Sequence, residues 1–359
     1  MKARALTLIL SLACGLLADQ ATPQSPSQAA PVDATVAILE AFRTHRLVAI
    51  GHHDDESQKF LRSLISDRRF SETVNDIVVE FGSAKYQEVM DRFQRGDEVP
   101  PRELEQVWQN VTGPNGSFDV PVIERFFRAV RDANALLPAQ RRLRVLLGEP
   151  PIDWAQIHSA ADHAAQLHAV GNRDAHAAAL IRREVLNKGR RALIVYGGLH
   201  FQRKNIFANY GPQWPEADTL VMQLEAQPPI KVFTIWRLTA STNMPAYFTT
   251  WPVPSMAMLR NTDLGMADFG LYFPYEGERR ASRNGKAVVT PREQWQSLRM
   301  QDQFDAVIYL GPKLSFEEWV LAQEKCSDRA YLEMRLRRLS MFSLYFKTDI
   351  DQLKKRCKI

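Results

Sequence analysis

Short, almost continuous apolar runs alternate along the first two thirds of the chain with longer segments of helical period. The runs cover residues 47–50, 77–79, 143–147 and 192–196. Runs of this length without polar alternation are typical of strands buried on both faces. Strand followed by helix, repeated, predicts an α/β fold with an open, mostly parallel sheet and flanking helices. Helices are expected at residues 58–65, 85–94, 102–109, 120–136, 154–170 and 173–188.

The last third of the chain has a different pattern. Two further strands are predicted at residues 232–236 and 306–309. Residues 241–300 between them are rich in Pro, Gly, Trp and Tyr, and we expect an irregular insertion there. Helical patterns follow at residues 316–324 and 330–346. The predicted organisation is one α/β domain over residues 34–312, followed by a C-terminal basic helical tail over residues 313–359.

The N-terminus has the pattern of an export signal. A short basic head precedes an apolar run that is too short to span a bilayer, and small residues follow it, which predicts a signal peptide over residues 1–21. Residues 22–33, rich in Pro, Gln, Ser and Ala, are predicted to be a flexible linker. We therefore expect an exported protein, periplasmic or secreted, with no transmembrane span in the mature chain. A lipoprotein acylated at Cys14 is the less favoured alternative, because Ser11 stands where leucine is usual.

Removal of the signal leaves two cysteines, Cys326 and Cys357. An even number of cysteines in an oxidising compartment is compatible with a disulfide bond that closes the tail. Two unpaired thiols are the other hypothesis.

Charge is concentrated at the C-terminus. Residues 329–359 hold nine basic and three acidic residues, so the tail carries +6 and the rest of the chain −1. A protein that covers phosphate backbones would carry basic charge on its main domain, so we expect no nucleic-acid partner. The tail could contact an anionic membrane surface. The alternative is a tail helix packed on the sheet with its arginines in water.

Polar side chains follow four of the predicted strands where each strand ends. Ligands of open parallel sheets bind outside the carboxyl ends of the strands, so residues at these positions are candidates for one site. Their types are those of metal ligands, acids and bases, and glycines that allow close approach. They are Gly51, His52, His53 and Asp54 after the first strand, Glu80 after the second, Glu149 and Asp153 after the third, and Gly197 and His200 after the fourth.

Other candidate motifs carry less weight. The spacing of His158, His163 and His168 rotates each by about 140° from the last on an α-helix, so they cannot form one metal face and are expected in solvent. The sequence contains no G-x-S-x-G, H-E-x-x-H, C-x-x-C, Walker or G-x-G-x-x-G motif. Arg173 begins a predicted helix that leads into the strand before His200, so its first turn is expected to lean over the same edge.

The segments 46–54, 75–80, 173–174 and 191–200 together resemble the erythromycin-esterase, ChaN and Tiki superfamily of exported α/β proteins. That superfamily has a G-x-x-H motif near each end of its core, a glutamate after an intervening strand and an arginine before the second motif. The resemblance covers about residues 34–200, with a weaker match at residues 304–311. It implies functional roles for Glu80, Arg173, Gly197 and His200.

The first motif departs from the superfamily pattern. Where Gly-Glu-x-His is usual, Gly51 is followed by His52, His53 and Asp54. A local shift would give His53 the role of the histidine, with Asp54 or Asp55 as the acid. This departure bears on catalysis more than on the fold.

The leading hypothesis is a hydrolase that activates water to cleave an ester or amide bond of a small molecule or peptide. His53, Glu80 and His200 would hold a divalent metal ion or act directly as base and electrostatic partner. Arg173 would stabilise the oxyanion, and His52 would carry a second proton or orient His53. The expected substrate-binding residues are Gly51, Asp54, Glu149, Asp153 and Gly197.

The alternative hypothesis is a haem-binding uptake protein without catalysis, which ChaN-like members suggest. His52, His53, Tyr196 or Tyr210 would then supply axial ligands, and the aromatic residues of the insertion would cover the macrocycle.

Overall fold

The computed structural model describes most of the 359-residue chain. It describes residues 26–359 except 117, 205–217, 228, 240–244, 270–278, 284–285, 291–297 and 313. The predicted signal peptide lies outside the described residues, as does Tyr210. No helix within the described residues has the length and apolar character needed to cross a bilayer.

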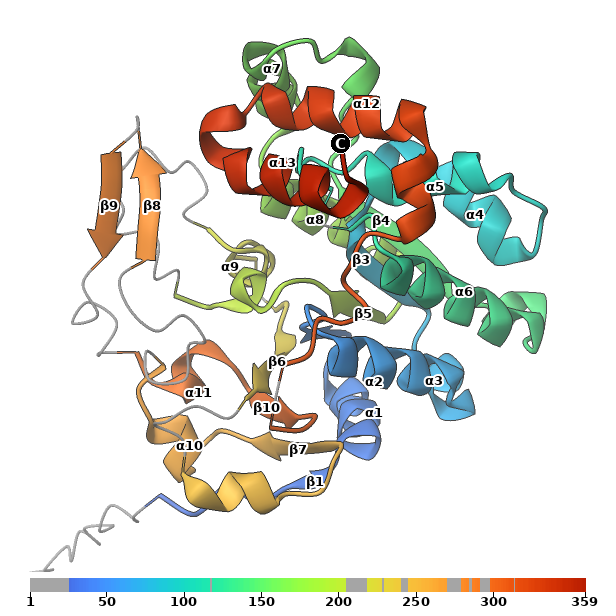
Figure 1. Ribbon diagram of the computed structural model, residues 1–359. Helices are drawn as coiled ribbons and strands as arrows, with labels where there is room; N and C mark the ends of the chain where they lie inside the picture. Colours follow the sequence, from blue (N-terminus) through green and yellow to red (C-terminus); the bar gives the residue numbers. More distant parts are fainter. Residues whose placement is uncertain are drawn as a thin grey trace, which may run out of the picture.

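An eight-stranded sheet forms the centre of the molecule, with the strand order β1-β7-β10-β6-β2-β5-β3-β4 (Figure 1). The six strands from β10 to β4 are all parallel, and β7 runs antiparallel to both of its neighbours. The predicted mostly parallel α/β sheet is therefore confirmed. The strands are β1 (Val32–Asp33), β2 (Leu47–Ile50), β3 (Asp76–Ser83), β4 (Arg144–Glu149), β5 (Ala192–Val195), β6 (Val232–Leu238), β7 (Ser255–Met258) and β10 (Ala306–Tyr309).

Helices cover both faces of the sheet because its strands are apolar on both sides. Val48 and Ile50 of β2 pack with α1, α2 and α6, whereas Leu47 and Ala49 pack with α8 and α9. The helices are α1 (Ala34–Thr44), α2 (Asp55–Ser66), α3 (Arg68–Thr73), α4 (Gln87–Arg95), α5 (Pro101–Gln109), α6 (Pro121–Ala135), α7 (Ala160–Val170), α8 (Arg173–Ile181), α9 (Leu220–Glu225), α10 (Asp263–Met266), α11 (Met300–Gln303), α12 (Arg329–Ser340) and α13 (Ser343–Cys357).

Two predicted helices differ from the observed ones. The segment 154–170 begins as a 3₁₀ helix at Trp154–Gln156, and α7 starts only after Ser159, whose hydroxyl accepts a bond from the Asp162 amide at 3.1 Å. The helix predicted at residues 316–324 is wrong, since the described residues there form turns that precede a 3₁₀ helix at Gln323–Ser327. Asp328 then caps α12 by accepting a bond from the Tyr331 amide at 3.1 Å.

The range predicted as an irregular insertion contributes to the main sheet. Its strand β7 lies between β1 and β10. Strands β8 (Arg279–Arg283) and β9 (Lys286–Thr290) form a separate two-stranded sheet. The expected flexible linker is fixed to this region in its described part, because Ser27 donates its amide to the Asn261 carbonyl and Ala29 to the Asp263 carboxylate, at 3.2 and 3.0 Å.

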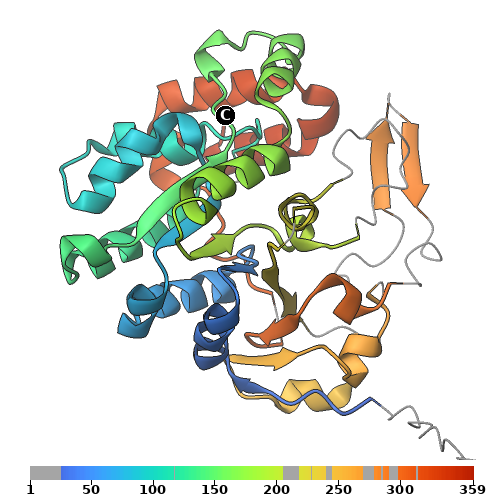
Figure 2. The same ribbon diagram turned by 180° about the vertical axis from the view of Figure 1, so that it is seen from behind.

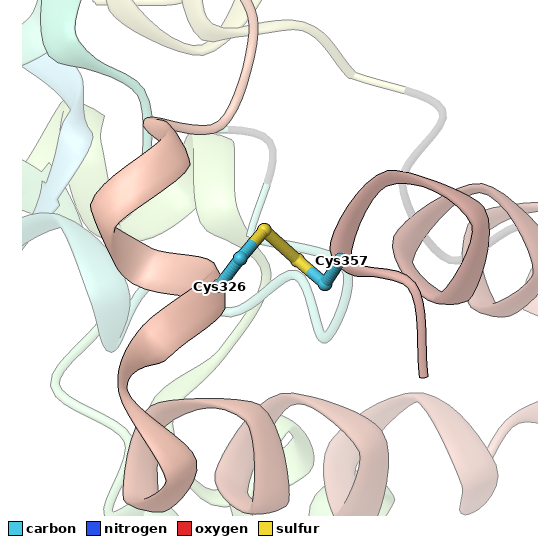
Figure 3. The surroundings of a disulfide bond; sticks show 2 residues. All are labelled: Cys326 and Cys357. Carbon is cyan, nitrogen blue, oxygen red and sulfur yellow. A yellow bond between two sulfur atoms is a disulfide. The ribbon is translucent and has the colours of Figure 1, made fainter.

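The C-terminal tail forms a helical hairpin of α12 and α13 beside α7, at one end of the molecule (Figures 1 and 2). A disulfide joins Cys326 and Cys357, whose Cα atoms are 4.9 Å apart, so the disulfide hypothesis is confirmed (Figure 3). Arg335 and Arg338 are buried rather than solvated. They donate to the Asn115 and Gln109 carbonyls, so part of the tail's charge anchors the hairpin.

Candidate functional site

The sheet brings the predicted residues together because their strands are neighbours in register. Ile50 of β2 lies beside Val195 of β5, which lies beside Val79 of β3. Gly51 and Glu80 directly follow residues of this row, so both lie at the same edge of the sheet. This edge is the carboxyl end of the parallel strands, where ligands bind in open α/β sheets.

Glu80 is the centre of the site. Its Oε1 atom lies 2.7 Å from the Nε2 atom of His52 and 3.2 Å from that of His53. Its Oε2 atom lies 3.4 Å from the Nε2 atom of His200. Three imidazole nitrogens from two loops thus surround both oxygens of one carboxylate, which is only 2% exposed.

The charge state of this cluster follows from its burial and hydrogen bonds. Burial alone would raise the pKa of Glu80, but the hydrogen bonds and charges of His52 and His53 hold it well below its usual range, so Glu80 is ionised. Burial, and to a smaller extent the neighbouring His53, lower the pKa of His52 to about 4. His52 is therefore neutral at pH 7. The Gln58 amide lies 3.4 Å from His52 Nδ1, which fits the tautomer in which Nε2–H donates to Glu80.

His200 is held by a carboxylate on each side. Its Nδ1 atom lies 2.5 Å from Asp174 Oδ1, in the first turn of α8. Burial lowers the pKa of His200, but Asp174 and Glu80 outweigh it and raise the pKa above its usual value. Asp174 follows Arg173 directly. Its position in the first turn of the helix was the only sequence signal for this role.

Arg173 pairs with Glu149 at the end of β4. Both Nε and Nη2 of Arg173 contact Glu149 Oε1, and Nη2 lies 4.0 Å from Glu80 Oε2. Burial opposes the charge on Arg173, yet Glu149 and Glu80 raise its pKa above the usual value. Glu149 Oε2 accepts bonds from the amide and hydroxyl of Thr112, so Arg173 is fixed between two carboxylates.

A cavity of about 800 Å³ opens above the cluster. Gly51, Asp54, Glu149 and Gly197 line it together with the three histidines, Glu80 and Arg173. Its walls are largely apolar, and besides Leu199 they include side chains from segments that we did not predict to reach the site. These are Val111, Phe118, Leu167, Trp236 and Trp319.

Trp319 belongs to residues 314–319, which cross over the paired histidines. Its ring centroid lies 5.8 Å from that of His52 and 6.1 Å from that of His53. Asp55 fixes the crossing segment by accepting bonds from Ser315 Oγ at 2.6 Å and from the Glu317 amide at 2.8 Å. Asp55 therefore supports the cavity wall.

Two other predicted residues have structural partners. Asp54 caps α2 by accepting bonds from the Glu56 and Ser57 amides, both at 3.1 Å, although it also lines the cavity. Asp153, expected to bind substrate, is not among the residues that line this cavity. It pairs with Lys85 at 2.7 Å and caps the 3₁₀ helix Trp154–Gln156.

One expectation about the spaced histidines is wrong. His163 is buried, and its Nε2 atom lies 2.9 Å from the Thr112 carbonyl. It therefore supports the loop whose Thr112 bonds Glu149. Helix α7 therefore contacts this loop through the face that carries His163.

A divalent metal ion could be held by His52, His53 and Glu80, whose potential ligand atoms lie within 4.8 Å of one another. Two imidazoles and a carboxylate are a ligand set suited to Zn²⁺. This set differs from the predicted one, because His200 is not part of it and His52 is. Asp174 holds the other nitrogen of His200, whose Nε2 atom lies 3.4 Å from the second Glu80 oxygen.

The haem hypothesis gains no support from this geometry. His52 and Tyr196 are 0% and 1% exposed, and His52 Nε2 already bonds Glu80, so neither side chain is available as an axial ligand. His53 alone remains accessible among the proposed ligands that the structure describes.

The fold and the site define an α/β protein with a histidine–glutamate cluster at the carboxyl edge of its sheet. No family model and no curated protein matches the chain. Among solved structures, it is similar to a succinoglycan biosynthesis protein, with 9% identity and a TM-score of 0.50 over 79% of this chain and 94% of that one. This likeness shows a shared fold.

Two further solved structures are more distant in shape. One is a Bacillus cereus protein with 10% identity and a TM-score of 0.45, over 80% of this chain and 95% of that one. The other is the type III effector HopBA1, with 10% identity and a TM-score of 0.37, over 80% of this chain and 98% of that one. The superfamily named from sequence segments stays a prediction.

Proposed function

We propose that this chain is an exported hydrolase that activates water to cleave an ester or amide bond of a small molecule or peptide. The observation that carries the proposal is the arrangement around Glu80. One ionised, buried carboxylate orients three imidazoles at the base of a large cavity. Groups with opposed protonation tendencies within hydrogen-bond reach are typical of acid–base catalysis.

His53 is the proposed general base. Its side chain is 54% exposed, and with its Nε2–H donated to Glu80 it presents Nδ1 to a water molecule. The absent side chain at Gly197 leaves room for this edge of the ring, since a Cβ there would lie 2.6 Å from His53 Cε1. His52, neutral and buried, donates to the same Glu80 oxygen and holds the carboxylate in place.

His200 and Arg173 are the proposed stabilisers of negative charge on the substrate oxygen. The raised pKa of His200 favours the imidazolium, which supplies a positive donor beside Glu80. Arg173 approaches the same Glu80 oxygen as His200, with Nη2 at 4.0 Å, and is fixed by Glu149. His200 can then deliver a proton to the leaving group, with Asp174 as its positioning residue.

The same cluster fits a metal-assisted form of this reaction. His52, His53 and Glu80 would hold the ion. A divalent ion bound there lowers the pKa of a bound water towards neutrality. Gln58, whose side-chain amide nitrogen lies 3.4 Å from His52 Nδ1, would act as the outer partner that fixes the imidazole.

Export is supported by the disulfide between Cys326 and Cys357, because such bonds persist in oxidising compartments. Contact of the tail with a membrane surface remains a weaker proposal. It rests on the exposed basic residues of α13, since Arg335 and Arg338 bond carbonyls of the domain.

The test is hydrolysis of a panel of aryl esters and anilides, with and without added Zn²⁺, Mn²⁺ or Co²⁺. We expect wild-type turnover, and a loss of about 10²–10⁴-fold in kcat/KM for Glu80→Gln. Asp153→Asn, which removes a carboxylate outside the cavity lining, is the matched control and should retain activity. The proposal fails if no member of the panel is cleaved under any condition, or if Glu80→Gln cleaves as fast as wild type.

A further inference from the structure

Arg237 lines the cavity with an incompletely paired guanidinium. Its Nε and Nη2 atoms lie 3.3 and 3.4 Å from the carboxylate oxygens of Asp54. Its Nη1 atom is buried and has no hydrogen-bond partner among the residues that the structure describes. A buried donor without an acceptor destabilises the fold, so such a group in a cavity wall points to a ligand that completes it.

Asp54 does not require Arg237 for its own hydrogen bonding. It accepts bonds from the Glu56 and Ser57 amides at the start of α2 and from Ser57 Oγ at 2.5 Å. These donors are closer than the guanidinium. Arg237 is therefore anchored at one edge by Asp54, and its remaining donor capacity is available to a second anion.

The position of Arg237 in the sheet indicates how far from Glu80 that anion would lie. Its strand β6 is separated from β3, which carries Glu80, by β2 and β5. Three strand spacings amount to about 14 Å between the two backbones. Both residues line the same cavity, whose wall also includes the apolar side chains of Leu199, Trp236 and Trp319.

We propose that Arg237 binds a carboxylate at the far end of the substrate, so that the substrate is an ester or amide with an apolar stretch between its reacting carbonyl and a single negative charge. A planar carboxylate matches the guanidinium fork. Asp54 and Glu56 lie close enough to act on the charge of Arg237, and their repulsion disfavours a dianion such as a phosphate monoester. The identity of the reaction rests on the proposed function, whereas binding of the carboxylate does not.

The kinetic test uses 4-nitrophenyl monoesters of dicarboxylic acids of increasing chain length, each beside the uncharged alkanoate ester of equal length. Wild type should prefer the charged member of the longer pairs. Arg237→Gln should lower the charged-to-neutral ratio of kcat/KM by about 10–100-fold and leave the neutral esters nearly unchanged. Arg203→Gln is the matched control, because Arg203 is a partly buried arginine that pairs with Glu225 and Asp305 outside the cavity lining.

A binding measurement separates this inference from the proposed function. Titration calorimetry compares a long phenylalkanoate with the corresponding amide and with a phenylalkyl phosphate. If no ester is cleaved but the carboxylate binds wild type at least 10-fold more tightly than Arg237→Gln, the proposed function fails and the inference stands. Equal affinity of the carboxylate for both proteins overturns the inference. So does tighter binding of the phosphate than of the carboxylate.

Discussion

The Nδ1 atom of His200 lies 2.5 Å from Oδ1 of Asp174, the residue that follows Arg173 in the first turn of α8. This contact fixes the ring so that Nε2 faces Glu80 at 3.4 Å. It also favours the imidazolium, because Asp174 raises the pKa of His200. The proposed hydrolysis should therefore depend on Asp174.

Asp174→Asn should move the alkaline limit of activity to lower pH. Because Asp174 raises the pKa of His200, its removal lets the imidazolium lose its proton at a lower pH. Profiles of kcat/KM against pH, with an NMR titration of His200, measure this shift. Asp153→Asn should leave the profile in place, and an unchanged profile in Asp174→Asn would contradict the assigned role. The raised pKa also stabilises the fold below the unfolded value of about 6.5, and that contribution is lost as pH rises through the folded value.

Acid should destabilise the protein through His52. Its pKa is lowered to about 4, so between pH 6.5 and 4 the unfolded chain binds a proton that the folded chain excludes. Stability from this group is complete above pH 6.5 and falls with pH. Urea unfolding at pH 7 and pH 5 should show about 2 kcal/mol more loss in wild type than in His52→Gln. His168→Gln, at an exposed position, should behave as wild type. Equal losses in wild type and His52→Gln would contradict the assignment.

Metal binding should depend on His53 and Glu80 and not on His200. We expect Zn²⁺ to raise the melting temperature of wild type and of His200→Ala, because the potential ligands are His52, His53 and Glu80. At a hundredfold excess over Kd the gain is about 2.7 kcal/mol. His53→Ala and Glu80→Gln should show little or no rise in differential scanning fluorimetry. If His200→Ala abolished the rise in melting temperature, the metal ligands would instead be those predicted from the sequence, His53, Glu80 and His200.

Gly197→Ala should impair activity through sterics. Gly197 has φ −58° and ψ 138°, which alanine adopts, but its Cβ would lie 2.6 Å from His53 Cε1. The displaced base should lower kcat/KM by about 10–100-fold with a small change in melting temperature. Gly51→Ala is the matched control, since its Cβ would lie 3.9 Å from the nearest atom, the Gly198 nitrogen. If the two variants had equal activity, His53 would not be the base.

The double variant Cys326→Ser/Cys357→Ser should be less stable than wild type. The bond closes a loop with a sequence separation of 31 residues, which corresponds to about 3–4 kcal/mol in the chain-entropy model. Thermal unfolding with and without a reducing agent measures the effect. The reducing agent should lower the wild-type melting temperature and leave that of the variant unchanged. A wild-type melting temperature that does not change with the reducing agent would contradict the expectation.

The parallel strands were predictable because full burial on both faces leaves a continuous apolar run. Strands β2 and β10 have the predicted bounds. Strand β7 was missed, since Ser255–Met258 contains no β-branched residue and follows a proline-rich segment. The pairing of a short run like this is set by the neighbouring strands, which local sequence does not reveal.

The polar base of the site was predictable from the ends of the strands, and its walls were not. Glu80 and the three histidines lie at the common edge as predicted. Trp319 reaches the site only because Asp55 fixes the segment before α12, and Arg237 only because β6 runs beside β2. Such placements arise from tertiary contacts between segments far apart in the chain.

The arginines of α12 that bond the Gln109 and Asn115 carbonyls also hold the loop between α5 and α6. The loop they hold supplies Val111, Thr112 and Phe118 to the lining of the cavity above Glu80. Thr112 of this loop also bonds Glu149, which holds Arg173 beside Glu80. A change in the packing of the C-terminal hairpin can therefore alter a wall of the cavity and, through the same loop, the position of a charged group at its base.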